Sequence, residues 1–258
     1  MLKKRIIPKL LLKNSKKNIP CLVNSLQFKK YQIVGHPISQ AKIFEAQHAD
    51  QLILLNIDSL KLDSNNSIVN LLKDFSLNIF MPLVFGGGVK DNASIELVLK
   101  NGADKVSLNS EAIKNKKIIS ESSKSFGKQC IVISIDYKNN GTFNEVFSDG
   151  GTNATGLNLI DWVKEVEDLG AGEILISDID RDGTGKGLNI EVSKNISDSV
   201  DIPVITSGGC GLAKHFVECF AKTDVQGIAA GNYFSLRDQS IYQTRSQLIN
   251  HKIPLRKI

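Results

Sequence analysis

Two glycine-rich segments contain the residue type that binds phosphate. They are Gly86–Gly88 and Gly208–Gly209, and each follows a short apolar run that begins at a proline, Pro82 or Pro203. Glycine lets backbone N–H groups come close to a phosphate, and the N-terminus of a following helix favours the anion. Glycines can also serve only to make a tight turn, but two copies in equivalent contexts favour a pair of phosphate sites. A ligand with a phosphate at each end would fit such a pair.

Carboxylates that directly follow apolar runs are the candidates for acid–base chemistry. Asp136 ends one such run, and Asp180 and Asp182 follow another. An ionised group at such a position is costly to keep unless it is paired or used. The segment around Asp180 also fits a salt-bridged turn, so a structural and a functional role are both open for that residue.

Short apolar runs alternate with longer amphipathic stretches, which is the pattern of buried parallel strands joined by helices. The predicted strands are Arg5–Leu11, Gln51–Ile57, Leu83–Phe85, Lys105–Leu108, Gln129–Asp136, Glu173–Ser177, Val204–Thr206 and Gly227–Ala230. The predicted helices are Ile38–Gln47, Ile68–Phe75, Asn92–Asn101, Glu111–Ser125, Leu159–Asp168, Ile190–Ile196, Ala213–Ala221 and Gln239–Asn250. Eight of each predict a (βα)8 barrel, because the rival doubly wound sheet would carry Gly-x-Gly-x-x-Gly after its first strand. We expect one barrel domain over residues 1–258.

The sequence also repeats itself at about half its length. Pro82–Gly88 aligns with Pro203–Gly209 at an offset of 121 (203 − 82), and three further segments align in the same order. Such a repeat predicts two homologous half-barrels closed into one domain. Loops at the carboxyl ends of barrel strands share one mouth, so the two glycine loops should face each other across it. The position equivalent to Asp136 in the first half is Leu11, which cannot carry a proton.

Composition excludes several classes of protein. Hydrophobic residues make up 41% and charged residues 23%, which is typical of globular proteins, and the net charge is +5. No dense Lys/Arg block with interleaved aromatics suggests nucleic acid, and no apolar run approaches the ~20 residues of a membrane span. The basic start and apolar Ile6–Leu12 would suit a secretion signal, but Pro8 and Lys9 interrupt the run. We expect a soluble cytoplasmic protein.

The remaining metal-binding residue types form no recognisable site. The four cysteines are Cys21, Cys130, Cys210 and Cys219, and they contain no Cys-x-x-Cys pair. We therefore expect free thiols, no metal and no cofactor. The histidines are expected at the surface of helices (His48, His215 and His251) or in a loop (His36).

Several segments resemble the cyclase subunit of imidazole glycerol phosphate synthase. They span nearly the whole chain and are Lys4–Pro8, Phe85–Val89, Gly102–Asn109, Thr155–Gly156, Trp162–Glu167, Gly170–Leu175, Ile179–Thr184 and Ser207–Gly209. The resemblance implies the (βα)8 barrel, a HisH-type glutaminase docked at the barrel bottom, and ammonia passing through the barrel. In that family ammonia reacts with a bisphosphorylated ribulosyl-carboxamide nucleotide. The products are imidazole glycerol phosphate and an aminoimidazole carboxamide nucleotide.

The same resemblance implies roles for individual residues. The phosphate-binding positions are Gly88, Asn109 and Ser110 on one side and Asp182, Gly183, Gly209, Ala230 and Gly231 on the other. The charged ring at the ammonia entrance is Arg5, Gln51, Lys105 and Glu173, with Gln51 where the family has Glu. Asp136 is the catalytic carboxylate, and Asp104 contacts the glutaminase.

The departures from the family fall at the catalytic centre. Where the family's first strand ends Cys-Leu-Asp, this chain has Lys9–Leu11, and a second-strand aspartate is Asn56. The family's loop lysine and glycine fall on Ile19 and Pro20. Each acid–base group contributes about 10²–10⁴-fold to a rate. Loss of the strand-one carboxylate should therefore nearly abolish ring closure.

Three functions remain open. The favoured one is a diverged paralogue that keeps the glutaminase partner and supplies ammonia for acetamidino sugars of a surface polysaccharide, together with a sugar amidotransferase. Proteins with this Pro-x-Leu-Leu first strand resemble cyclase-like proteins found with such enzymes. The alternatives are a working cyclase subunit of histidine biosynthesis and a non-catalytic subunit that activates a glutaminase. A phosphoribosyl isomerase also needs carboxylates on strands one and five, so Leu11 argues against it equally.

Overall fold

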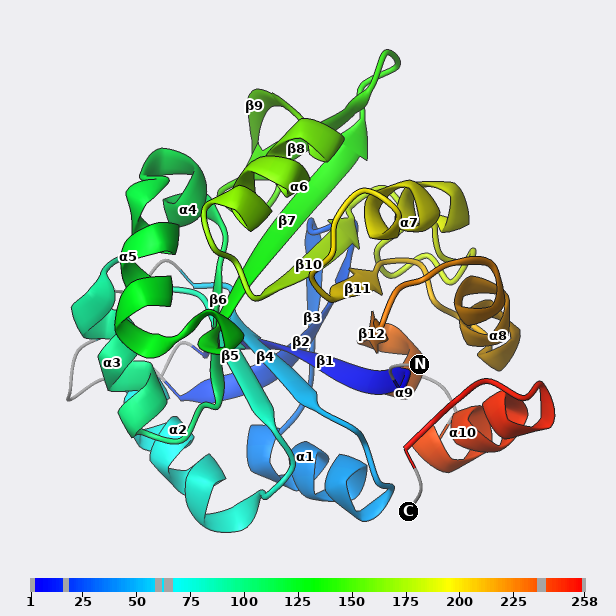
Figure 1. Cartoon of the computed structure of the whole chain (residues 1–258). Helices are drawn as coiled ribbons and strands as arrows, with labels where there is room; N and C mark the ends of the chain where they lie inside the picture. The colour runs from blue at the N-terminus through cyan, green and yellow to red at the C-terminus, as the bar shows by residue number, and fades with distance from the viewer. Residues whose placement is uncertain (1–2, 16–18, 59–61, 63–66, 236–239, 257–258) are drawn as a thin grey trace.

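Eight parallel strands close into a barrel that helices surround (Figure 1). The computed structural model describes residues 3–15, 19–58, 62, 67–235 and 240–256. The barrel strands are β1 (Arg5–Asn14), β4 (Leu52–Asn56), β5 (Leu83–Gly86), β6 (Lys105–Leu108), β7 (Ile131–Asn139), β10 (Glu173–Asp178), β11 (Val204–Ser207) and β12 (Gly227–Ala230). Parallel pairing of β12 with β1 and of β7 with β10 joins the two halves into a closed cylinder. The (βα)8 barrel expected from the alternating pattern is confirmed.

The helices that cover the barrel follow its strands in turn. They are α1 (Pro37–Ala46), α2 (Ser67–Asn78), α3 (Asn92–Lys100), α4 (Ser110–Lys114), α5 (Lys117–Phe126), α6 (Leu159–Asp168), α7 (Ile190–Ser197), α8 (Ala213–Lys222), α9 (Asn232–Ser235) and α10 (Ile241–Asn250), with a short 3-10 helix at Lys128–Cys130. Their inner faces bury a continuous apolar shell against the outside of the strands. None of the helices in the described ranges is long and apolar enough to cross a membrane.

The inside of the barrel holds a separate apolar layer. Its members are Ile7, Ile53, Val84, Val132, Leu175, Ile205 and Ala229, one from each of seven barrel strands. All seven are fully buried, and each large side chain stabilises the fold by about 1.5–3 kcal/mol. This layer lies between the strand starts, which carry the charged ring, and the strand ends, which form the mouth.

Two strands continue beyond the barrel into antiparallel hairpins that the sequence did not predict. β1 pairs with β2 (Pro20–Leu26), which pairs with β3 (Lys30–Gly35). β7 pairs with β8 (Asn144–Ser148), which pairs with β9 (Asn153–Asn158), and this hairpin projects from the barrel in Figure 1. The β2–β3 turn places Gln27 and Phe28 at positive φ, 51° and 59°. Glycine or asparagine usually marks such turns, so these residues gave no signal.

Two expectations about helices are wrong. The predicted helix Glu111–Ser125 is two helices, because Asn115 between them adopts an extended conformation (φ −135°, ψ 87°). His215 is buried rather than at the surface, since its Nδ1 accepts hydrogen bonds from the backbone N–H groups of Gly211 and Leu212 at 3.1 and 3.3 Å. The predicted start of the last helix, Gln239, lies outside the described residues.

Candidate active site

Asp136 is a buried carboxylate near the carboxyl end of β7, with a side chain turned toward the mouth. Only 7% of the residue is exposed, and Asn109 Nδ2 donates a hydrogen bond of 2.7 Å to its Oδ2. Burial raises the pKa of Asp136 to about 6, against the lowering effects of the Lys9 charge and the Asn109 hydrogen bond. A carboxyl group that titrates near neutrality is suited to proton transfer.

Lys9 brings a positive charge into the interior of the barrel beside that carboxylate. It lies on β1 in alternation with Arg5 and Ile7, so its side chain faces inward, one layer above the apolar layer. It is 5% exposed, and its Nζ lies 3.9 Å from Asp182 Oδ1. From the sequence, Lys9 is only a departure from the family pattern. In the structure it is the charged group that β1 brings to the mouth, two residues before Leu11, which stands where the family has its carboxylate.

Asp182 closes this charge cluster from the loop after β10. Its Oδ2 accepts a hydrogen bond of 2.6 Å from Ser25 Oγ, and its backbone oxygen accepts one of 3.0 Å from the N–H of Gln27. Both partners belong to the β2–β3 hairpin and its turn, so this hairpin fixes the position of Asp182. By contrast Asp180, which was left open as a functional candidate, is exposed.

Leu11 lies two residues beyond Lys9 and is half-buried. It pairs in register with Leu55 of β4 and Val23 of β2. The strand-one site of the expected second carboxylate is thus bordered by apolar residues and by the ammonium of Lys9. A carboxylate pair built from β1 and β7 does not exist here.

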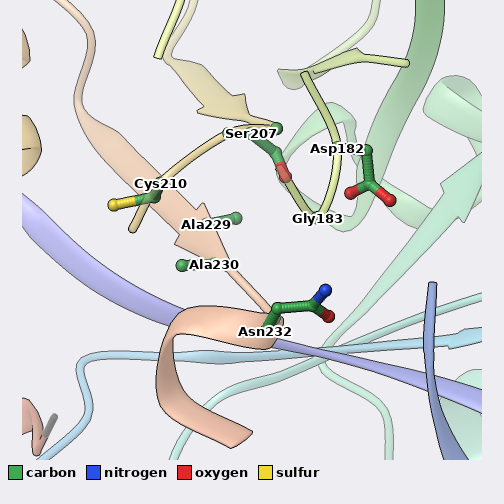
Figure 2. A pocket seen from close by; sticks show the side chains of 10 residues that line it. Asp182, Gly183, Ser207, Cys210, Ala229, Ala230 and Asn232 are labelled. Atoms are coloured by element: carbon green, nitrogen blue, oxygen red, sulfur yellow. The ribbon is translucent and has the colours of Figure 1, made fainter. Parts of the chain in front are cut away.

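The second glycine loop forms a pocket with its neighbours (Figure 2). Its lining contains all five residues expected on this side and is made by Asp182, Gly183, Ser207, Gly208, Gly209, Cys210, Ala229, Ala230, Gly231 and Asn232. Gly209 has φ +97°, and a Cβ there would lie 2.3 Å from the Gly187 oxygen. Gly183 has φ +73°, and its Cβ would lie 2.3 Å from the Ser25 oxygen. Only glycine fits either position, so backbone rather than side chain lines the pocket.

Ser207 supplies this pocket with an unused hydroxyl. The residue is 2% exposed, and its buried Oγ has no hydrogen-bond partner within the described part of the chain. Figure 2 shows the hydroxyl directed toward the opening, whereas the sulfur of Cys210 points away from it. A buried hydroxyl without a partner is costly, and a bound anion would satisfy it. Sequence reasoning did not select Ser207, although it directly precedes the glycine pair.

The first glycine loop lies across the mouth, after β5. Gly87 has φ +94° and approaches Asn56 so closely that a Cβ would lie 1.9 Å from the Asn56 oxygen. Gly88 also has a positive φ of 79°. Of the polar residues expected with them, Asn109 is used by Asp136, and Ser110 Oγ accepts a hydrogen bond of 2.8 Å from the N–H of Asp149. A phosphate role for these residues stays a prediction.

The ring expected at the ammonia entrance is assembled at the other end of the barrel. Glu173, 2% exposed, forms ion pairs with Arg5 and with Lys105, the latter at 2.8 Å. Arg5 Nη1 donates a hydrogen bond of 2.7 Å to Gln51 Oε1. The buried Nε2 of Gln51 has no partner among the residues that the structure describes. The four side chains therefore meet, with one anion for two cations, and their role at an ammonia entrance stays a prediction.

The surface beside this ring combines polar and apolar groups. Asp104 is exposed and accepts a hydrogen bond of 2.8 Å from the Leu83 N–H. It borders a second pocket, between the end of α2 and the start of β5, whose lining includes Phe75, Ile79 and Phe80. Phe80 itself is 85% exposed.

The described residues give no sign of a metal centre. No group of three His, Cys, Asp or Glu side chains in those ranges is placed to hold a metal ion. All four cysteines are free, and burial raises the pKa of the Cys219 thiol to about 11.

Comparison with known proteins relates this barrel to one family along its whole length. A family model described as "Histidine biosynthesis protein" matches residues 5–239. A protein of Prochlorococcus marinus (strain MIT 9313), provisionally named imidazole glycerol phosphate synthase subunit hisF2, is 42% identical over 260 residues, or 99% of each chain. Imidazole glycerol phosphate synthase subunit HisF of Hydrogenobaculum sp. (strain Y04AAS1) is 39% identical, over 99% of this chain and 100% of its own. The HisF subunit of Lactococcus lactis subsp. cremoris (strain SK11) is 37% identical, over 100% and 98%.

Proposed function

Because the chain belongs to the histidine biosynthesis protein family and is of the HisF type, we propose that it is the barrel subunit of a glutamine amidotransferase complex. A HisH-type glutaminase docks at the barrel bottom, and ammonia crosses the barrel to an acceptor other than the cyclase's nucleotide. The favoured acceptor is the acetamido group of a surface-polysaccharide sugar, with a sugar amidotransferase as a further partner.

One observation carries this proposal. Charged side chains cluster at both ends of the barrel, but those at the mouth differ from the ones that the cyclase family has there. Lys9 and Leu11 stand where the family's first strand supplies a carboxylate, and Asp136 faces an ammonium instead of a second acid. Loss of selection would have eroded the glycine loops and Asp136 as well. Substitutions at the mouth end of β1, at Lys9 and Leu11, support a different acceptor for the ammonia.

The glycine pocket supports an anionic ligand at the mouth. Positive-φ glycines bring backbone to the surface of the pocket, and the Ser207 hydroxyl lacks a partner. We propose that this pocket holds one phosphate, with Asp182, Gly183, Gly209, Ala230 and Gly231 around it. The loop of Gly88, Asn109 and Ser110 holds the other. The ligand is then a small molecule with two phosphate groups.

The barrel bottom supports a protein partner and entry of ammonia. Exposed Phe80 and Asp104 lie beside the pocket between α2 and β5, and Leu77 is also 76% exposed. Aromatic side chains surrounded by polar groups are typical of interface centres. The ring of Arg5, Lys105 and Glu173 forms the entrance beside this surface.

The second candidate is the cyclase subunit of histidine biosynthesis itself. The names of the Hydrogenobaculum and Lactococcus relatives favour it, since each matches the chain over its full length. In this case Asp136 would have to perform the proton transfers of ring closure without the strand-one carboxylate. The buried cation at Lys9 would then disfavour any positive charge that develops at the reaction centre.

The test supplies the bisphosphorylated ribulosyl-carboxamide nucleotide with an ammonium salt and follows the imidazole product. The Hydrogenobaculum HisF subunit, assayed in parallel, gives the rate of a subunit that carries the cyclase name. We expect this chain to be slower by about 10²–10⁴-fold, the contribution of one acid–base group. Turnover within a few-fold of that relative would reject the paralogue and establish the cyclase.

A further inference from the structure

Lys9 places an ammonium group inside the barrel, where few water molecules can solvate its charge. Burying an unpaired charge is expensive, so buried lysines are paired or neutralised. Lys9 is 5% exposed and has the apolar layer on one side and the mouth on the other. Its recorded ion pair, to Asp182 Oδ1 at 3.9 Å, is longer than a hydrogen bond. A single loose pair is weak compensation for that burial.

Asp136 is a second carboxylate on which the charge of Lys9 acts, although no direct ion pair joins the two side chains. Four groups act on this carboxylate from the elements packed around it: Lys9 on β1, Asn109 after β6, Ser177 on β10 and Asp182 after β10. Lys9 is the only cation among them, while Asp182 is a second anion. Without Lys9, two carboxylates would share one buried site, which normally forces one of them to take up a proton.

We propose that Lys9 is a positioning residue that holds Asp136 ionised and facing the mouth, in place of the strand-one carboxylate that Leu11 replaced. Strands β1 and β7 then contribute one ammonium and one carboxylate to the mouth, rather than two acids. Asn109 fixes the carboxylate from the opposite side, because its Nδ2 donates to Oδ2 at 2.7 Å. This inference rests on the proposed role of the mouth as the reaction site, but it concerns a charge state that can be measured without any substrate.

The test is a titration of the Asp136 carboxyl carbon by nuclear magnetic resonance on the full, carbon-13-labelled chain. The signal is assigned by its loss in Asp136→Asn. The wild-type midpoint is expected at about 6. In Lys9→Met, which keeps the length of the side chain but not its charge, the midpoint should rise by at least ~1 unit. Lys9→Arg, which restores the charge, should return it toward the wild-type value.

A matched control comes from the same face of the same strand. Lys13 lies four residues further along β1 and pairs with Asp58 at 3.1 Å, half exposed at the rim. Lys13→Met should leave the Asp136 midpoint unchanged. If Lys9→Met does not fold, Lys9→Cys is used, because cysteine is the residue that the family has there. An unchanged or lower midpoint in either Lys9 variant would overturn the inference. Such a result would leave the proposed ammonia supply intact, since that function is tested by product formation.

Discussion

The two ends of strand β1 carry cations in very different surroundings. At the barrel bottom, Arg5 is matched by Glu173 and by the Gln51 oxygen, in a ring whose cations are about one quarter exposed. At the mouth, Lys9 is deeply buried near two carboxylates, Asp136 on β7 and Asp182 in the loop after β10. Compared with the family pattern, the bottom has an uncharged glutamine, Gln51, in place of a glutamate. The mouth has Leu11 in place of an aspartate and Lys9 in place of a cysteine.

In the proposed function, this difference assigns the new task to the mouth rather than to the barrel bottom. A glutamine where the family has glutamate keeps the shape of the ring and its hydrogen bond to Arg5. A leucine for an aspartate, with a lysine two residues before it, gives the mouth end of β1 a positive charge where the family has a negative one. Partner docking and ammonia entry can therefore persist while the acceptor changes.

The largest effect is expected when the mouth is made like that of a cyclase. The double substitution Lys9→Cys/Leu11→Asp restores the family's Cys-Leu-Asp strand end. Ring closure from the bisphosphorylated nucleotide and ammonium should rise by about 10²–10⁴-fold over wild type, because a second acid–base group returns. Leu11→Asp alone should give less, since Lys9 would pair with the new carboxylate. No gain in the double variant would mean that the mouth has diverged at more than this strand.

The next effect is on the free energy of unfolding, which the buried, ionised Asp136 lowers. Its pKa is raised from 3.8 to about 6, so the folded state binds a proton more tightly than the unfolded chain. Stability from this group is present below about pH 4 and is lost as the pH rises through 6, by about 3 kcal/mol in all. Asp136→Asn should therefore raise the free energy of unfolding at pH 8 by up to that amount, and the gain should vanish at pH 4. Denaturant titrations at both pH values measure it, and a less stable variant at pH 8 would contradict the account.

A smaller effect is expected at the barrel bottom. Glu173→Gln leaves Arg5 and Lys105 without their shared anion, which for a fully buried pair costs about 3–5 kcal/mol. Solvent reaches both cations, so we expect a loss of about 2 kcal/mol in denaturant unfolding. The control is Glu165→Gln, which breaks the exposed pair with Lys116 and should cost less than about 1 kcal/mol. Equal losses in the two variants would show that the ring is not a buried electrostatic unit.

The smallest effect is expected from restoring the ring's second anion. In Gln51→Glu the new carboxylate pairs with Arg5, but it also loses its hydration at a site that is 3% exposed. These contributions oppose each other, so the free energy of unfolding should change by less than about 1 kcal/mol. A loss above about 2 kcal/mol in the same denaturant experiment would show that the ring is built around an uncharged glutamine.

Much of the fold could be predicted from the sequence because barrel strands are short apolar runs with clear ends. The bounds of β6, β12 and α6 agree with the prediction at both ends. The hairpin after β1 could not be predicted, because its turn residues have positive φ without being glycine. Its packing depends on distant contacts, such as that of Ser25 with Asp182, which no local pattern encodes.

The candidate site was predicted in its parts but not in its centre. The glycine loops and Asp136 were recognised because each stands at the end of a predicted strand, whereas the ring residues were assigned only through the family resemblance. Lys9 was not, although alternation with Arg5 and Ile7 already assigned it to the barrel interior. Its significance depends on Asp136 on β7 and Asp182 in the loop after β10, both of which lie far from Lys9 in the sequence.

The most direct test assembles the chain with a HisH-type glutaminase and follows two products of one reaction mixture. One is glutamate, released from glutamine, and the other is imidazole glycerol phosphate, the imidazole compound formed from the bisphosphorylated nucleotide. The account predicts that the barrel accelerates release of glutamate while imidazole stays at or near background. Imidazole formed in step with glutamate would contradict it, because the mouth of this barrel would then catalyse ring closure with Asp136 as its one catalytic carboxylate.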